Sequence, residues 1–354
     1  MSLIDRYLQR VLEQDGSDLH LLAGDPPRIR RYGDLMAIEP AALRAEEVRE
    51  ALYAIMPRGT QSAFERHDSA DFAYMVPDLA RFRVNVFRHL NGMGAVFRAI
   101  PSRAKSLEEL DMPPAVHNLA RSTNGLILVT GKTGSGKSTT LAAMVDAINR
   151  RIKGHVLTIE DPIEFVHSRK NCLISQREVG THSPSFAAAL QSALREDPDV
   201  VLVGEMRDLE TIAIAVTAAE MGILVMGTLH TNGAAPTVDR IVNAFPAEKQ
   251  PHIRTMLSTS LRGVISQQLL PRKDGKGRVP AMEILINTPA VGNLIRQGKL
   301  DQLESTIQAG GTVGMRSMDS ALRELLDRRM ITGREAYLAA NNKAAFEDVR
   351  EQTR

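Results

Sequence analysis

A glycine-rich stretch that ends in lysine and serine carries the most defined chemistry in this sequence. Residues 131–139 read GKTGSGKST, which fits the pattern G-x-x-x-x-G-K-[S/T]. Its glycines permit a tight backbone turn that directs N–H groups toward phosphate oxygens. Lys137 can reach the β- and γ-phosphates of a nucleotide, and Ser138 can ligate Mg²⁺. The predicted ligands are therefore ATP and Mg²⁺. The predicted binding residues are Gly131, Thr133, Gly134, Ser135, Gly136, Lys137, Ser138 and Thr139.

Acids and a histidine follow three short apolar runs, VLTI, VVLV and ILVM. If these runs are parallel strands, their carboxyl ends meet at one edge of the sheet, beside the phosphate loop. Hydrolysis needs a carboxylate to orient water, a group for the metal shell and a group that senses the γ-phosphate. The candidates for these roles are Glu160, Glu164, Glu205 and His230. A solvated loop charge is the alternative for any one acid taken singly.

The second half of the chain has the pattern of an α/β core. Apolar runs at 126–130, 156–159, 200–203 and 223–226 suit strands of a parallel sheet that is buried on both faces. Helical stretches separate them: Ser183 and Pro184 are expected to open one helix, and Asp208 to cap the next. Alternation of strands and helices predicts right-handed crossovers in a P-loop domain.

The first part of the chain predicts a smaller α+β domain with an antiparallel sheet. A helix is expected over 46–56, followed by the strands DFAYMV, RFRVNVF and MGAVFRAI, with a hairpin at Asn91-Gly92. Apolar residues alternate with Arg81, Arg83 and Asn85, so one face of that strand is basic. The predicted division is a domain over 1–100, a linker over 101–114 and a core over 115–354.

Composition excludes several classes of protein. Hydrophobic residues make up 43% of the 354 residues and charged residues 24%, which is typical of globular domains. A net charge of +2, 4% aromatic residues and no tryptophan leave little for nucleic-acid binding. One cysteine cannot build a disulfide or a zinc site alone. Neither a signal peptide nor an apolar run of membrane-spanning length is found, so a cytoplasmic location is expected.

Several segments resemble one family of ATPases. VLTIEDPIEFVH at 156–167 resembles the aspartate box of the type II secretion and type IV pilus ATPases. DVVLVGEMRDLETI at 199–212 is similar to their Walker B segment, and GTLHTNGAAPTVDRI at 227–241 to their histidine box. GSDLHLLAGDPPRIRRYGD and RFRVNVFRHLNGMGAVFRAIP resemble the PAS-like N-terminal domain of the pilus retraction ATPases. The resemblance implies a RecA-like core and ATP hydrolysis that drives retraction of a type IV pilus.

The resemblance also implies roles for single residues. Glu164 would activate the attacking water, Glu205 would act in the Mg²⁺ and water shell, and His230 would contact the γ-phosphate. Glu160, with Asp161, would support the site. The family forms ring hexamers in which arginines from the next subunit close each site. The resemblance further implies a pilus platform protein of the inner membrane as partner, with membrane contact only through partner proteins.

The candidates for those arginines are Arg83 and Arg98, together with Arg81. Such an arginine would neutralise charge that grows in the transition state. For any one of them, a solvated polar face is the alternative interpretation.

Two positions depart from the family pattern. The second residue of the phosphate loop is Lys132 where the family has proline, and AVGNLIRQ at 290–297 stands in place of AIRNLIRE, a motif tied to retraction. Residues 290–297 are expected to form a helix, and Gly292 is expected to make this helix less stable by about 1 kcal/mol relative to alanine. The departures predict a retraction motor with an altered output surface.

Three other functions are alternatives to pilus retraction. A pilus assembly or type II secretion ATPase is the nearest alternative, but those proteins carry a tetracysteine zinc subdomain, which a single cysteine cannot form. A DNA-strand motor is disfavoured by the low aromatic content. A structural subunit that does not hydrolyse ATP is disfavoured by the presence of Lys137, Glu205 and His230.

Overall fold

The computed structural model describes residues 2–31, 34–77, 79–100, 103–275 and 277–350. The chain divides into two compact units at Arg103. The first also takes in Glu164–Val166, and the second comprises Ala104–Ile163 and His167–Arg354. Of the predicted linker, residues 101 and 102 lie outside the described residues, whereas Leu107 and Met112 are buried in the second unit. In the described residues no helix is both long and apolar enough to span a membrane.

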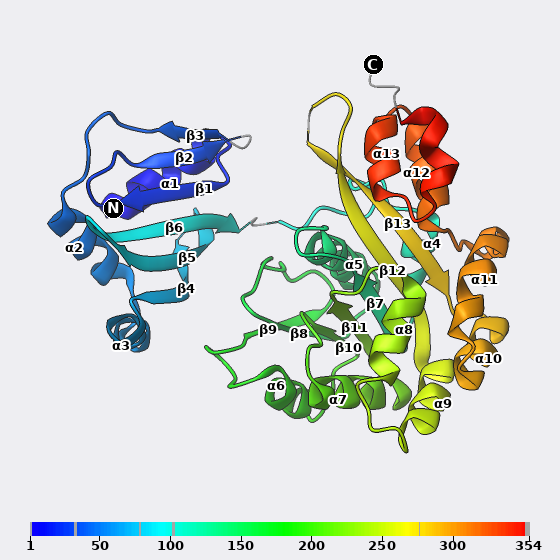
Figure 1. Ribbon diagram of the computed structural model, residues 1–354. Coiled ribbons are helices and arrows are strands. Elements are labelled where there is room, and N and C mark those ends of the chain that lie inside the picture. Colours follow the sequence, from blue (N-terminus) through cyan, green and yellow to red (C-terminus); the bar gives the residue numbers. More distant parts are fainter. Residues whose placement is uncertain (1, 32–33, 78, 101–102, 276, 351–354) are drawn as a thin grey trace. The chain divides into compact units, whose positions relative to one another are not determined.

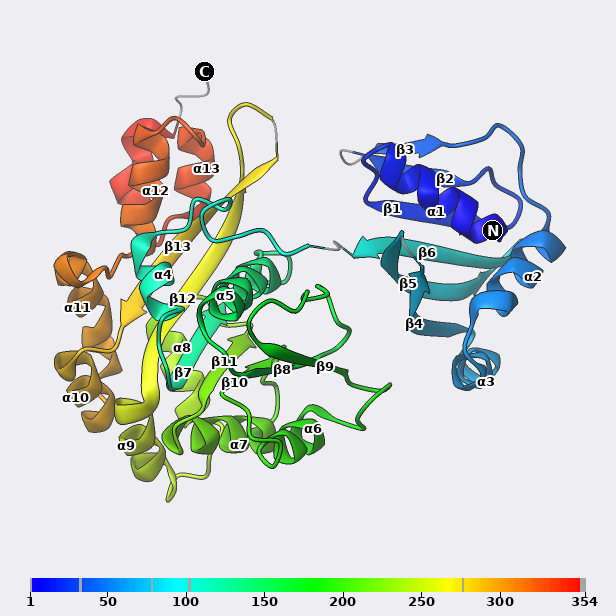
Figure 2. The same ribbon diagram turned by 180° about the vertical axis from the view of Figure 1, so that it is seen from behind.

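The first unit is a six-stranded antiparallel sheet with helices packed on one face (Figures 1 and 2). The strand order is β3-β2-β1-β6-β5-β4. The elements are α1 (Leu3–Glu13), β1 (Asp18–Leu22), β2 (Arg28–Arg31), β3 (Asp34–Ala37), α2 (Ala45–Ile55), α3 (Arg58–His67), β4 (Ser69–Val76), β5 (Ala80–His89) and β6 (Gly92–Ile100). The helices bury Leu8, Leu52 and Phe64 in one core with Phe82 and Phe97 of the sheet. The antiparallel sheet predicted for this part of the chain is confirmed.

The turn of the β5–β6 hairpin lies one residue earlier than the sequence predicted. His89 pairs with Gly92, so Leu90 and Asn91 form the turn, and Gly92 already belongs to β6. Gly92 has φ +131°, a conformation that residues with a Cβ rarely adopt. Along β5, alternate residues such as Phe82 and Val84 are buried toward the helices. The intervening arginines therefore lie on the opposite face of the sheet, as predicted.

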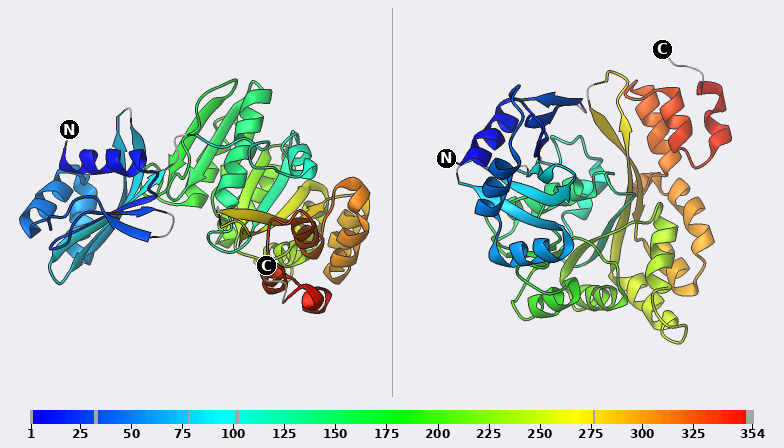
Figure 3. Two further views of the ribbon diagram at one scale, coloured as in Figure 1. Left: turned by 90° about the horizontal axis from the view of Figure 1, so that it is seen from above. Right: turned by 60° about the vertical axis from the view of Figure 1, so that its left-hand side comes forward.

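The second unit is built on a seven-stranded sheet in the order β13-β12-β7-β11-β10-β8-β9 (Figures 1 and 3). Six strands are parallel, and β13 pairs with β12 in the antiparallel direction. The strands are β7 (Gly125–Thr130), β8 (His155–Glu160), β9 (Leu173–Glu178), β10 (Val200–Val203), β11 (Leu224–Leu229), β12 (Leu261–Pro271) and β13 (Arg278–Ile286). The four predicted parallel strands are β7, β8, β10 and β11. The long strand β12 was missed.

Helices cover both faces of this sheet and make two separate cores. They are α4 (Pro114–Leu119), α5 (Lys137–Arg151), α6 (Phe186–Ala193), α7 (Leu209–Glu220), α8 (Ala234–Val242) and α9 (Gln250–Ser260). On β7, Leu126 and Leu128 belong to the core with α6 to α9, whereas Ile127 and Val129 belong to the core with α4 and α5. Burial on both faces explains why each strand reads as a continuous apolar run.

Cap residues confirm one predicted helix start and correct another. Asp208 caps α7, because its Oδ1 accepts a hydrogen bond from the N–H of Thr211 at 2.8 Å. The start of α6 was predicted at Ser183 and Pro184, and this is wrong by two residues. Ser185 is the cap, and its hydroxyl accepts from the N–H of Ala188 at 3.1 Å. Ser183 instead pairs with Val179 as an isolated bridge.

Short helices complete the second unit beyond β13. They are α10 (Pro289–Gln297), α11 (Leu303–Ala309), α12 (Met318–Asp327) and α13 (Gly333–Ala339). Figure 3 shows α12 and α13, in red, beside the β12–β13 pair. Pro289 opens α10, with Thr288 as its cap. The motif over 290–297 is therefore this helix, which packs on α9.

Gly292 lies in the contact between α10 and α9. It is buried, and a Cβ built on it would meet the Ser258 carbonyl oxygen of α9 at 2.8 Å. A backbone oxygen cannot move aside cheaply, so glycine permits the close approach of the two helices. Glycine lowers the intrinsic stability of the helix, but it also allows α10 to pack closely on α9, and these two effects oppose each other.

Replacing Gly292 with alanine should lower stability, despite the better helix propensity of alanine. We expect Gly292→Ala to lower the free energy of unfolding by about 1 kcal/mol, because overpacking exceeds the gain in propensity. Thermal unfolding measures the change. Gly311→Ala is the matched control in the same unit, since nothing lies within 4 Å of a Cβ there and its φ is not positive. A Gly292→Ala protein more stable than wild type would contradict the packing argument.

Candidate nucleotide site at the carboxyl edge of the parallel sheet

The phosphate loop joins β7 to α5, as the motif predicts. Gly131, Gly134 and Gly136 have φ of +138°, +78° and +89°, which only glycine adopts without strain. Gly136 is the N-cap of α5, so the free N–H groups of the first helical turn face the loop. An anion at this position would interact favourably with these groups and with the helix dipole.

Lys137 is folded back onto its own loop. Its ammonium donates to the carbonyl oxygens of Gly131 at 2.9 Å and Lys132 at 3.1 Å. The hydroxyl oxygen of Ser135 is buried in the same loop without a hydrogen-bond partner. A buried hydroxyl of this kind can donate a hydrogen bond to a phosphate oxygen, so the residues present suit a nucleoside triphosphate. Lys137 would have to exchange a carbonyl oxygen for a phosphate oxygen when nucleotide binds.

A cavity of about 730 Å³ adjoins the loop within the second unit. Gly136, Thr139 and Thr140 line its phosphate side, and Met112 and Arg278 line other parts of its wall. This volume lies in the range of small-molecule sites. The cavity can therefore hold the ribose and base of a nucleotide whose phosphates lie in the loop.

Glu205 and His230 meet at the carboxyl edge, after β10 and β11. His230 Nε2 lies 2.9 Å from Glu205 Oε1, and Arg207 also pairs with Glu205. Burial acts to raise the pKa of Glu205, but the hydrogen bond from Arg207 and the charge of His230 outweigh it and hold the pKa below its ordinary value. Glu205 is thus a carboxylate at neutral pH. The sequence missed Arg207, although it stands only two residues after Glu205.

Glu160 ends β8 at the same edge. Its Oε1 accepts hydrogen bonds from the Thr158 hydroxyl at 2.7 Å and from Gln176 Nε2 at 3.4 Å. The Asp161 carboxylate that follows is exposed and adds negative charge near Arg207. Glu164 belongs with the first compact unit, so its role in the site stays a prediction. In the described residues no cluster of three or more His, Cys, Asp or Glu side chains could bind a metal ion.

The loop that carries His230 is fixed by residues that the sequence did not single out. At its end, the N–H of Gly233 donates to Ser266 Oγ at 2.8 Å, and the N–H of Ala234 donates to Glu283 Oε1 at 2.7 Å. Ser266 and Glu283 are paired neighbours on β12 and β13. Burial raises the pKa of Glu283, and backbone donors oppose this. No sequence motif marks these two positions.

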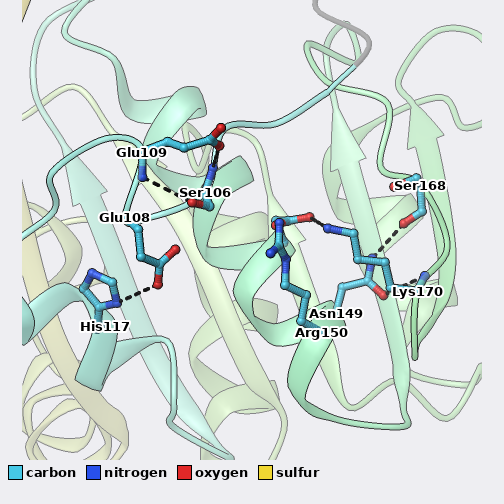
Figure 4. Close-up of polar contacts among 9 residues, drawn as sticks. Ser106, Glu108, Glu109, His117, Asn149, Arg150, Ser168 and Lys170 are labelled. Atoms are coloured by element: carbon cyan, nitrogen blue, oxygen red, sulfur yellow. Dashed lines mark hydrogen bonds and ion pairs between the residues drawn. The ribbon is translucent and has the colours of Figure 1, made fainter.

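The segment between β8 and β9 is anchored to α5 by hydrogen bonds and ion pairs (Figure 4). Asn149 is 1% exposed, and its Nδ2 donates to the carbonyl of Ser168 at 2.8 Å. Its Oδ1 accepts from the N–H groups of Lys170 and Cys172. Asp146 pairs with both Lys170 and Arg150. These contacts fix residues 168–172, directly after the segment that resembles the aspartate box, to the phosphate-loop helix.

The arginines predicted to act on a neighbouring subunit lie side by side in the first unit. Arg83 pairs with Arg98 across the β5–β6 ladder. Arg98 donates to Asp18, with 2.8 Å between Nε and Oδ1, and Asp18 is 4% exposed. Arg83 forms a loose ion pair with Asp71, with 3.9 Å between Nε and Oδ1. Arg83 is therefore the less constrained of the two.

A family model described as type II/IV secretion system protein matches residues 1–341. The chain belongs to this family.

Individual members of the secretion-system family are similar over nearly the whole chain. The type IV pilus retraction ATPase PilT of Pseudomonas aeruginosa is 53% identical over 333 residues, which cover 94% of this chain and 96% of the relative. A twitching motility protein of Neisseria gonorrhoeae is 53% identical over 320 residues, or 90% of this chain and 86% of that one. A crystal structure of the pilus retraction motor PilT with bound ADP superposes with a TM-score of 0.91 at 42% identity, and covers 98% of this chain and 99% of that one. The predicted fold class and the predicted family are confirmed.

His167, in this family's aspartate-box segment, should make stability depend on pH. Burial lowers the pKa of His167 to about 4, while Asp146 opposes the shift and Lys170 adds to it. Below about pH 6.5 the unfolded chain binds a proton that the folded protein does not. Stability should therefore fall toward acid, by about 2 kcal/mol at pH 5 from this residue.

We expect His167→Gln to remove that part of the loss. Urea unfolding at pH 5 and pH 7.5 measures the difference. His252→Gln, which changes an exposed histidine on α9, should keep the wild-type pH dependence. The same acid-side decline in the His167→Gln protein would contradict a buried neutral imidazole.

Proposed function

We propose that this chain hydrolyses ATP to drive retraction of a type IV pilus. The observation that carries the proposal is 53% identity to PilT along 94% of the chain, combined with an intact phosphate loop. The pairing of Glu205 with His230 beside that loop supports hydrolysis rather than nucleotide binding alone. The crystal structure of PilT contains ADP, which supports an adenine nucleotide as the ligand of this chain.

Each side chain at the sheet edge has a proposed part in the reaction. Lys137 binds the β- and γ-phosphates, with the loop N–H groups of residues 131–139. Ser138 and Glu205 would hold Mg²⁺ together with the nucleotide phosphates, directly or through its water shell. Glu164 activates the water that attacks the γ-phosphorus, and the bond to the β–γ bridging oxygen breaks to give ADP and phosphate. His230 senses the γ-phosphate, and Glu160 supports the edge from β8.

We further propose that six copies form a closed ring. Arg83 and Arg98 would then reach the nucleotide of the neighbouring subunit and neutralise charge in the transition state. Their position on the face of the first unit away from its helices supports this role. Since Arg83 has the weaker ion pair, it is the better candidate for a residue that changes partners when nucleotide binds.

The proposed setting is the base of the pilus. The motor would act from the cytoplasm on a platform protein of the inner membrane, meet the membrane only through partner proteins, and bind no nucleic acid. The names of the two similar proteins, for pilus retraction and for twitching motility, support this setting. The alternative is an ATPase of pilus assembly or type II secretion, which belongs to the same family.

Substitutions at the sheet edge separate binding from hydrolysis. Lys137→Ala should lose ATP binding, because it removes the ammonium group that lies inside the phosphate loop, bonded to the carbonyl oxygens of Gly131 and Lys132. Glu205→Gln should keep binding but lose hydrolysis by about a hundredfold, because a neutral amide cannot replace the carboxylate in the metal and water shell. Equilibrium nucleotide binding and phosphate release measure the two effects.

The same variants test the biological role in a strain that lacks the gene. Wild-type protein should restore pilus retraction, and both variants should fail to do so. Near-wild-type turnover by either variant would refute the site. A deletion strain that fails to assemble pili or to secrete, rather than one whose assembled pili fail to retract, would favour the alternative function.

Mixing two inactive variants tests the ring. Arg83→Ala lacks the donated arginine, and Lys137→Ala lacks a working nucleotide site. In mixed rings, an intact site on an Arg83→Ala subunit can receive Arg83 from a Lys137→Ala neighbour. We expect the mixture to regain measurable ATPase activity, while each variant alone stays inactive. Efficient hydrolysis by a monomeric wild-type protein in sedimentation experiments would rule out the shared site.

A further inference from the structure

Gln267 lies on β12 directly behind the phosphate loop. Ser266 pairs with Thr130 of β7, so Gln267 is level with Gly131, the first residue of the loop. Its side chain is 2% exposed and both ends of its amide are bonded. Nε2 donates to the Ser135 carbonyl at 2.6 Å, and Oε1 accepts from the Thr140 hydroxyl at 2.8 Å. The amide orientation is unambiguous, because a carbonyl can only accept.

The bond to Ser135 fixes the direction of the next N–H group. In a planar trans peptide, the C=O and the following N–H point in opposite directions. Holding the Ser135 carbonyl against Gln267 therefore directs the N–H of Gly136 away from β12, toward the inside of the loop. That N–H belongs to the set that binds phosphate in loops of this kind.

The close fit of Gln267 restricts which residues the loop can contain. A Cβ on Gly136 would meet Gln267 Nε2 at 2.6 Å, and a Cβ on Gly131 would meet the Gln267 backbone oxygen at 2.3 Å. Two of the motif's glycines are thus required by β12 as well as by their own φ angles. Gln267 and Thr140 also line the 730 Å³ cavity beside the loop.

We propose that Gln267 is a positioning residue of the nucleotide site, which orients the N–H of Gly136 toward the β-phosphate and ties that peptide to the first turn of α5 through Thr140. The inference rests on the proposed function, since it needs an adenine nucleotide in the loop. Gln267 acts on binding more than on the chemical step, because ADP and ATP both carry the β-phosphate.

The test compares ADP affinity, steady-state kinetics and thermal stability. Gln267→Met keeps the length of the side chain and removes both hydrogen bonds. The Kd for a fluorescent ADP analogue and the KM for ATP should both rise about tenfold, as loss of one oriented hydrogen bond predicts. The kcat should change less than twofold. A residue with a purely structural role would lower Tm and leave the Kd unchanged.

Gln268→Met is the matched control on the same strand. Gln268 donates to the Ala339 carbonyl at 3.3 Å, so this variant loses a comparable bond away from the loop. It should keep the wild-type Kd for the ADP analogue, even if its Tm falls. Equal losses of affinity in the Gln268→Met and Gln267→Met proteins would overturn the assignment, and so would a wild-type Kd in Gln267→Met.

Two further variants decide the matter if Gln267→Met does not fold. Thr140→Val removes only the bond to Oε1 and should raise the Kd less than threefold. Gln267→Glu keeps an acceptor for Thr140 but places a carboxylate against the Ser135 carbonyl, so its Kd should rise well above that of Thr140→Val. Equal Kd values for these two proteins would overturn the assignment. Failure of the wild-type protein to bind the ADP analogue would overturn the proposed function, and the role of Gln267 with it.

Discussion

Parallel pairing of β7, β11, β10 and β8 is the constraint on which the site depends. Because parallel strands all end at one edge, residues far apart in the chain arrive beside the phosphate loop without any contact of their own to bring them there. Such a parallel sheet must be covered by apolar side chains on both faces. Two apolar cores cover the two faces, one under α6 to α9 and one under α4 and α5.

Charge at this edge is balanced before any ligand arrives. Arg207 and His230 both pair with Glu205, and Lys137 is bonded to carbonyl oxygens of its own loop. A triphosphate would compete for Lys137 and His230, so its binding would change which groups neutralise Glu205. Glu205 and Lys137 therefore have polar partners within the chain, which avoids leaving a partly buried charge unpaired.

Strand β12 connects the two loops of the site through alternate side chains. Ser266 and Gln267 are consecutive, so they point to opposite faces of the sheet. One bonds the end of the loop that carries His230, and the other bonds the phosphate loop. Through β13, Glu283 bonds that same loop end and the N–H of Met318 at the start of α12. The β12–β13 pair thus joins the nucleotide loops to the C-terminal helices.

The sequence alone determined the parts of the protein that depend on local pattern. Continuous apolar runs predicted four parallel strands, the glycine-rich motif predicted a loop between a strand and a helix, and alternation along RFRVNVF predicted a basic face. These predictions succeed because, in each case, the residue type is determined by the backbone conformation or the burial at that same position. The hairpin turn and the cap of α6 were misplaced by one or two residues, since neighbouring residues satisfied the same local rule equally well.

Tertiary structure alone decided the contacts between distant segments. Nothing local marks Gln267, Asn149 or Glu283, because each is an ordinary polar residue until a partner more than 15 positions away faces it. At Gly292, the local sequence gives the wrong expectation because it does not show the packing partner. Helix propensity describes it as a weak point, but the Ser258 carbonyl at 2.8 Å makes any larger side chain the costlier choice. Propensity belongs to one residue, whereas packing belongs to two, and the second residue is found only in the folded chain.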